Sequence, residues 1–141
     1  MFKRTDELGF ELENSQSIHS YMEANAAEFD DKNFYSFLST LIADSGKPKT
    51  KIVADAYISE PYLYNLIRGE KRPTRNSVIK LAFGLGLTLE TTERLLMLAG
   101  YSNFYVRHKR DALLKHAFQS SMNISEADNL LMGYGFSVMT E

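Results

Sequence analysis

Hydrophobic residues recur at intervals of three or four along most of the chain, the spacing that places them on one face of an α-helix. We expect helices over residues 15–29, 33–46, 48–56, 59–68, 74–85, 88–100, 107–119 and 124–133. Residues 1–14 show no clear period and are expected to form a frayed, acidic arm. No segment has the sustained alternation of a strand, so the pattern predicts an all-α fold with short connections.

Polar residues and glycines mark the expected helix ends. A side chain that can accept a hydrogen bond from the first turn precedes several of the apolar runs, and glycine, which tolerates a left-handed C-terminal cap, follows others. The candidate N-caps are Ser15 or Ser17, Asp31 or Asn33, Ser59 and Asn123, and the candidate stops are Gly46, Gly69 and Gly100. Asn123 followed by Glu126 also has the spacing of a capping box.

The last two expected helices echo the preceding two at an offset of 35 residues. Arg75, Val78, Ile79, Lys80, Ala82 and Phe83 correspond to Arg110, Leu113, Leu114, Lys115, Ala117 and Phe118, and the run Leu95-Leu96-Met97 corresponds to Leu130-Leu131-Met132. Two similar pairs can stack as helical repeats do, although amphipathic helices can also resemble one another by chance. We expect three parts: an acidic arm and helix over 1–30, a domain over 31–102, and a helix pair over 103–141 packed on it.

Charge is segregated along the chain, although its net charge is only −2. Residues 1–31 hold two basic and eight acidic side chains, whereas residues 47–80 hold eight basic and three acidic ones. Such segregation can direct an attractive field toward an anionic partner from one face of an acidic protein. It can also produce two solvated faces without a partner.

The amino-acid composition limits the classes of protein to which this chain can belong. Hydrophobic residues make up 44% of the chain, enough for one core, and the absence of cysteine excludes disulfides and thiolate metal sites. No run of 18 apolar residues and no signal peptide is present, so we expect a cytoplasmic protein with no membrane partner. Phosphate-binding glycine loops, zinc-protease motifs and nucleophile elbows are missing as well. We therefore expect a protein that is not an enzyme and has no cofactor or metal.

The segment KPKTKIVADAYISEPYLYNLIRGEKRP, residues 47–73, predicts two short helices joined by a tight turn and followed by basic residues. The second helix begins at Ser59 and ends at Gly69, with Leu63 and Leu66 on its inward face. Two helices joined by a turn of about three or four residues can place the second helix in the major groove of DNA.

Residues 34–102 resemble the lambda-repressor/Cro-like helix-turn-helix domain of the xenobiotic-response-element (XRE) family of regulators. The resemblance lies in ISEPYLYNLIRGEKRPTRNSVIKLAFGLGLT, where Arg72-Pro73 and then Leu81, Ala82, Leu85 and Gly86 stand at the family's spacing. It implies a lambda-repressor-like helix-turn-helix bundle, extended here by an N-terminal helix and a C-terminal helix pair. It also implies sequence-specific binding of double-stranded DNA by a transcriptional regulator that acts as a homodimer.

The resemblance assigns site residues by position, with residues 59–68 as the recognition helix. The base-facing positions are Glu60, Pro61, Tyr64 and Asn65. The positions that would contact phosphate are Lys49, Arg68, Lys71, Arg72 and Arg75. Asparagine can bond adenine and glutamate can accept from cytosine, whereas basic side chains bind the backbone and dominate affinity.

Several residues leave alternatives open. Tyr57 stands at the turn position that the family usually fills with glycine, so we expect the turn to be wider than usual. Tyr62 can pack or contact DNA, and Arg68 can cap its own helix instead of binding phosphate. Glu60 and the exposed tyrosines also fit a protein-interaction module that keeps the fold without binding DNA. A protein partner could then bind through the acidic N-terminal helix.

Overall fold

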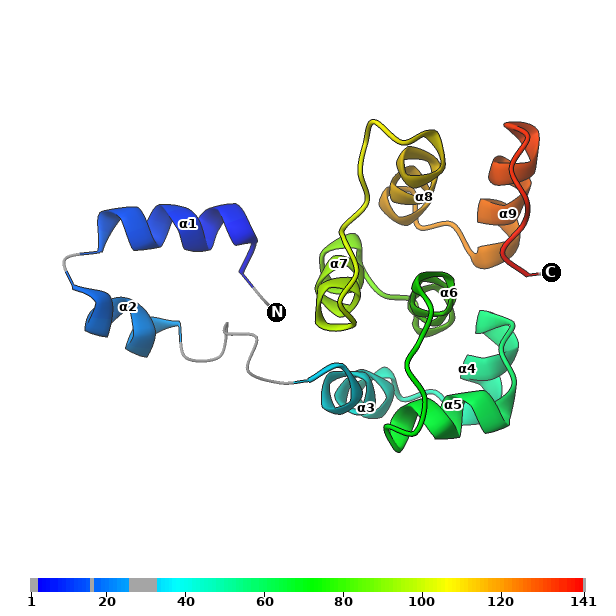
Figure 1. The fold of residues 1–141 in the computed structure, drawn as a ribbon, viewed down its shortest axis with the longest axis horizontal. Helices are drawn as coiled ribbons and strands as arrows, with labels where there is room; N and C mark the ends of the chain where they lie inside the picture. The colour runs from blue at the N-terminus through cyan, green and yellow to red at the C-terminus, as the bar shows by residue number, and fades with distance from the viewer. Residues whose placement is uncertain (1–2, 16, 26–32, 141) are drawn as a thin grey trace. The chain divides into compact units, whose positions relative to one another are not determined.

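The computed structural model describes residues 3–15, 17–25 and 33–140, and every regular element in these ranges is an α-helix (Figure 1). The prediction of an all-α fold is therefore confirmed. The chain divides into two compact units, Met1–Lys32 and Asn33–Glu141, here called the N-terminal and C-terminal units. In the described ranges, no helix is long and apolar enough to cross a membrane.

The N-terminal unit contains two helices, α1 (Thr5–Asn14) and α2 (Ile18–Ala24). The expectation of a frayed arm over 1–14 is thus wrong, because most of this segment is α1. Ser17 caps α2 by accepting a hydrogen bond from the Ser20 N–H, as one of the two expected caps. Residues 26–29 of the helix expected over 15–29 lie outside the described residues.

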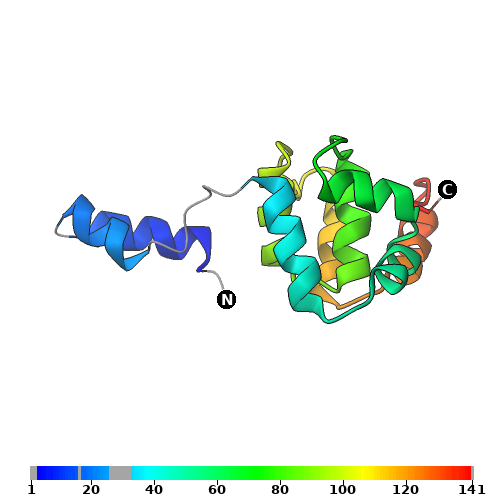
Figure 2. The ribbon, with the colours of Figure 1, turned by 90° about the horizontal axis from the view of Figure 1, so that it is seen from below.

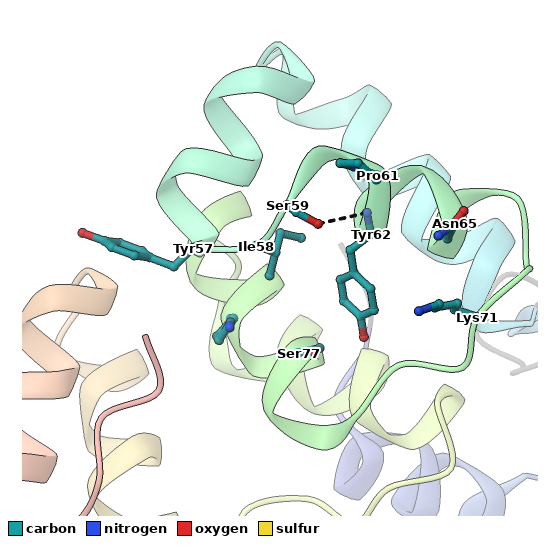
Figure 3. Close-up of a pocket in the computed structure, with 9 residues that line it drawn as sticks. Tyr57, Ile58, Ser59, Pro61, Tyr62, Asn65, Lys71 and Ser77 are labelled. Atoms are coloured by element: carbon teal, nitrogen blue, oxygen red, sulfur yellow. Dashed lines mark hydrogen bonds between the residues drawn. The ribbon is translucent and has the colours of Figure 1, made fainter. Parts of the chain in front are cut away.

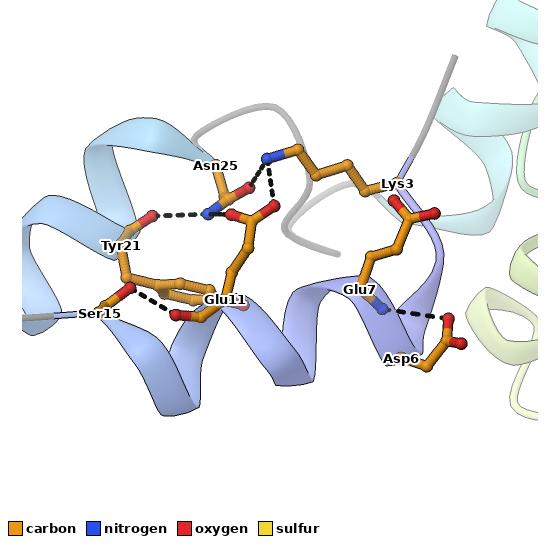
Figure 4. A network of polar contacts seen from close by, with 7 residues as sticks. All are labelled: Lys3, Asp6, Glu7, Glu11, Ser15, Tyr21 and Asn25. Carbon is orange, nitrogen blue, oxygen red and sulfur yellow. Dashed lines mark hydrogen bonds and ion pairs between the residues drawn. The ribbon is translucent and has the colours of Figure 1, made fainter.

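A polar network joins α1 to the end of α2 (Figure 4). Lys3 Nζ donates to Glu11 Oε1 at 2.7 Å and to Asn25 Oδ1 at 2.6 Å, and Asn25 Nδ2 donates to Glu11 Oε2 at 2.9 Å. Asn25 is only 2% exposed, whereas no residue of either helix is buried. Hydrogen bonds from Lys3 and Asn25 lower the pKa of Glu11 below its usual value. Polar contacts thus join the two helices.

The C-terminal unit is built around α6 (Arg75–Leu85), which lies in the middle of the unit (Figures 1 and 2). All residues from Val78 to Leu85 except Lys80 are buried. The other helices of the unit are α3 (Phe34–Ser45), α4 (Lys49–Ala56), α5 (Glu60–Ile67), α7 (Leu89–Leu98), α8 (Lys109–Gln119) and α9 (Ile124–Gly133). Of these, α3, α4, α7 and α9 pack directly on α6.

Helices α4 and α6 cross in close contact. Gly84 of α6 faces Ala56 and Ile52, and a β-carbon at Gly84 would lie 2.6 Å from Ala56 Cβ and 2.9 Å from the Ile52 carbonyl oxygen. Lys47 Nζ also donates to the Gly84 carbonyl at 2.8 Å. Only glycine at position 84 allows α4, the first helix of the expected motif, to seat this closely.

The expected helix ends are observed in the C-terminal unit. Asn33 and Ser59 accept hydrogen bonds from the first turns of α3 and α5, and Gly46 ends α3 in the left-handed conformation. Asn123 and Glu126 form the complete capping box of α9.

The echo between helix pairs extends to features of the structure. Helices α7 and α9 have equal lengths and are offset by 35 residues, and the equivalent Gly100 and Gly135 have φ of 89° and 85°. The equivalent rings of Phe83 and Phe118 stack with centroids 4.2 Å apart, which joins α6 to α8. The second pair therefore extends the core of the C-terminal unit.

Candidate nucleic-acid interface

Residues 57–59 form the turn between α4 and α5. Tyr57 has φ 56° and ψ 45°, and the Ile58 N–H closes the end of α4 by donating to the Val53 carbonyl at 3.2 Å. Tyr57 does not widen the connection as expected. It adopts the left-handed conformation itself, which is unfavourable for a residue that carries a β-carbon.

We expect Tyr57→Gly to be more stable than Tyr57→Ala by about 1 kcal/mol, because both remove the half-exposed ring but only alanine keeps the strained β-carbon. Urea unfolding followed by circular dichroism measures the difference. Equal stability of the two variants would show that the left-handed conformation costs nothing at this position.

Helix α5 has one buried and one exposed face. Ser59 Oγ accepts from the Tyr62 N–H at 3.2 Å and starts the helix, and Leu63 and Leu66 are fully buried. The four base-facing candidates lie on the other side: Glu60, Pro61 and Tyr64 are exposed, and Asn65 is half-buried. Glu60 also lies in the first turn, where a negative charge interacts favourably with the helix dipole.

Asn65 is connected to a charged pair at the end of α5. Arg68 Nη2 donates to Asn65 Oδ1 at 2.9 Å, and the same guanidinium donates to Glu70 from Nε at 3.0 Å. Arg68 is the C-cap residue of α5, but its side chain contacts Asn65 and Glu70. Asn65 Oδ1 thus already accepts one of the two hydrogen bonds that an amide oxygen can accept, while Glu70 competes with any phosphate for Arg68.

The basic residue at the start of α4 lies beside the exposed side of α5. Lys49 is exposed, and its Nζ lies 6.0 Å from the centre of the Tyr64 ring. Tyr64 itself is 39% exposed, as a base-facing position requires. Lys49 and Tyr64 therefore share a face although they belong to different helices.

The connection between α5 and α6 presents Lys71 and Arg72 to solvent. Pro73 is buried, and the Tyr101 hydroxyl donates to its carbonyl at 2.6 Å, which fixes the end of this connection to the segment after α7. Arg72 Nη2 lies 3.2 Å from the position that a β-carbon on Gly100 would occupy, so the Arg72 guanidinium lies against the residues that follow α7.

Arg75 has a different role from the expected phosphate contact. Its Nη1 and Nη2 donate to the two carboxylate oxygens of Asp111 at 2.9 and 3.1 Å, and Nη2 also reaches the Ser102 and Asn103 carbonyls at 3.3 Å. Burial raises the pKa of Asp111, but the hydrogen bonds from Arg75 and the Tyr105 N–H outweigh it, so the net pKa is lowered. Arg75 thus ties α6 to α8, and a phosphate contact by Arg75 would require this pair with Asp111 to open.

A hollow of about 450 Å³ lies beside α5 (Figure 3). It is lined by Tyr57, Ile58, Ser59, Pro61, Tyr62, Asn65, Lys71, Ser77 and Lys80. The half-buried Tyr62 ring and the Lys71 side chain point into it, whereas Tyr57 points away. Two base-facing candidates, Pro61 and Asn65, thus border the same concavity as two lysines.

The eight basic residues of 47–80 divide into two sets. Lys47 and Lys51 pair with Asp55, Arg68 pairs with Glu70 and Arg75 pairs with Asp111. Among the residues that the structure describes, no acidic side chain pairs with Lys49, Lys71, Arg72 or Lys80. Sequence reasoning did not select Lys80.

Comparison of the chain with family models, curated proteins and solved structures gives no match. Within the described ranges there is also no group of three or more histidine, aspartate or glutamate side chains that could hold a metal ion. The site residues themselves therefore carry the functional argument.

Proposed function

We propose that this protein binds double-stranded DNA sequence-specifically and regulates transcription. In this proposal α4, the turn and α5 form a lambda-repressor-like helix-turn-helix motif of the XRE type, and α5 enters the major groove. The observation that carries the proposal is that four basic residues of this segment have no acidic partner among the described residues. Lys49, Lys71, Arg72 and Lys80 form no ion pair among the described residues, and three of them lie beside α5 or in the hollow that borders it.

Backbone contacts contribute most of the affinity in this proposal. Lys49, Lys71 and Arg72 bind phosphates and set the register, while Arg68 can join them only by leaving Glu70. Asn65 is the main base reader. Its amide oxygen already accepts one hydrogen bond from Arg68 and has a second lone pair for an adenine amino group, while its amide nitrogen can donate to the adenine ring.

Two copies of the chain would read a two-fold symmetric operator. A dimer that presents one α5 to each half-site requires half-site centres about one helical turn, or roughly 34–36 Å, apart.

The roles assigned to Asn65 and Arg72 predict that one substitution reduces base specificity and the other reduces overall DNA affinity. Asn65→Ala should reduce the free-energy difference between the preferred base and the other bases at one operator position by about 1–3 kcal/mol. The salt dependence of binding should stay unchanged. Arg72→Ala should weaken binding to all duplexes alike and reduce the slope of log affinity against log salt by about 0.9. Selection from random duplexes with each variant, followed by salt titration, separates them. Unchanged specificity in Asn65→Ala would remove Asn65 as a base reader.

A second candidate function is protein binding through the N-terminal unit. Its two helices expose Phe10, Leu12, Ile18 and Met22, between 46% and 68% each, on an acidic segment. Exposed apolar side chains mark a binding surface where they form one contiguous patch. Recovery of a stoichiometric protein partner by the full chain, with no duplex bound at low salt, would favour this function over the first.

A further inference from the structure

The hollow beside α5 has a lining suited to an anion. It contains Lys71 and Lys80 but no aspartate or glutamate. Tyr62 and Ser77 add hydroxyl groups. Ser77 Oγ also lies within hydrogen-bond distance of Thr74 Oγ1, at 2.8 Å, and a serine hydroxyl can both donate and accept. A concave lining with two lysines and two hydroxyl-bearing side chains favours a charged group rich in acceptor oxygens.

Lys80 is held in place by the core of the C-terminal unit. It is the one residue between Val78 and Leu85 that is not buried, and it is half-buried itself. A lysine in this position can lay its aliphatic stem along the surrounding apolar surface and extend its ammonium group into the hollow. The central helix thus presents this charge from a rigid base, unlike the charges of the connection over residues 70–74.

We propose that the hollow holds one phosphate of the DNA backbone and that Lys80 is a phosphate-contacting residue; this rests on the proposed function. The occupant is a backbone phosphate because Pro61 and Asn65 border both the hollow and the base-facing side of α5. A strand whose bases meet Asn65 must carry its phosphates past this edge of the helix. Lys71 and Lys80 bind that phosphate from the connection and from α6, respectively.

The echo between the two helix pairs offers a matched control for substitutions of Lys80. Lys115 of α8 is equivalent to Lys80 at the 35-residue offset, and both side chains are half-buried. Lys115 does not line the hollow. Replacing either lysine with methionine removes the charge and keeps an unbranched stem, so any effect on packing should be similar in the two variants.

The test is a salt titration of the full chain with its selected duplex, followed by fluorescence anisotropy. Lys80→Met should weaken binding roughly 8-fold at about 0.1 M salt and reduce the slope of log affinity against log salt by about 0.9, the effect of one neutralised phosphate. Lys115→Met should match the wild type, and Lys80→Arg should retain both the affinity and the slope.

Each other outcome has a distinct meaning. If the wild type binds its duplex and Lys80→Met behaves like Lys115→Met, the assignment of Lys80 is wrong while the proposed function stands. If the wild type selects no duplex, both fail. A free-phosphate site is tested with inorganic phosphate and chloride at equal ionic strength. In the contrary result, phosphate raises the Tm of the wild type but not of Lys80→Met, while the slope of DNA affinity against salt is the same in both proteins. That result would show that the hollow binds a free anion and not a phosphate of DNA.

Discussion

Replacing Gly84 with alanine should lower the free energy of unfolding of the C-terminal unit by about 3 kcal/mol, the upper range for overpacking a core. The new β-carbon would lie 2.6 Å from Ala56 Cβ, 2.9 Å from the Ile52 oxygen and 3.0 Å from the Ala56 nitrogen. Two of these three atoms belong to the backbone of α4, which cannot move without displacing Lys49 and the turn. DNA affinity should therefore fall together with stability.

Gly133→Ala is the matched control, because Gly133 is also helical and a β-carbon there meets no atom within 4 Å. This substitution should stabilise the protein by up to roughly 0.5–1 kcal/mol through the ordinary helix preference of alanine. Urea unfolding of both variants measures the contrast. Similar stability of Gly84→Ala and Gly133→Ala would contradict the close crossing of α4 and α6.

Replacing Asp111 with alanine should cost about 3 kcal/mol of stability, because removing one partner of a buried ion pair leaves the other uncompensated. The Asp111 side chain is 10% exposed and that of Arg75 is 25% exposed. The substitution also leaves the Tyr105 N–H, which donates to Asp111 at 2.9 Å, without its acceptor. Asp44→Ala on the exposed side of α3 removes the same charge and should change stability by less than about 0.5 kcal/mol.

The same substitution should show a characteristic dependence on pH. The pKa of Asp111 is lowered in the folded protein, because the hydrogen bonds from Arg75 and Tyr105 outweigh the effect of burial. Its stabilising contribution is therefore present above the unfolded pKa and is lost as pH falls through the lower, folded pKa. The difference in unfolding free energy between wild type and Asp111→Ala should shrink with acidification below about pH 4. A constant difference would show that the carboxylate charge is not what matters.

Local signals in the sequence predicted the helices of the C-terminal unit well. Asn33, Ser59 and Asn123 cap helices by short-range hydrogen bonds, and Gly46 ends α3 through its own backbone freedom. Such interactions join residues only a few positions apart, so one sequence is enough to recognise them.

Helix α1 could not be predicted in this way. Its apolar residues form no buried stripe, and its contacts with the end of α2 are polar ones made by Lys3, Glu11 and Asn25. These three residues are up to 22 positions apart, and periodicity carries no information about a polar contact over that distance.

The sequence selected the residues of the candidate site but carried no information on the interactions of each side chain. Position in the motif selected Arg75, but its partner Asp111 lies 36 residues further along the chain. The sequence also indicated no role for Lys80, because the hollow is lined by residues of the turn, α5, the connection and α6 that come together only in the folded chain. Tyr57 shows the reverse case, since the tertiary fold imposes a left-handed conformation that the residue disfavours.

Selection of the full chain against a pool of random duplex DNA at low salt tests the central proposal most directly. We expect one enriched sequence with two-fold symmetry, bound with an affinity that falls linearly in log salt at about 0.9 per neutralised phosphate. Asn65→Ala should broaden the enriched sequence at one position in each half. A pool that stays random after repeated rounds, with no duplex retained by the wild type, would contradict DNA recognition by α5.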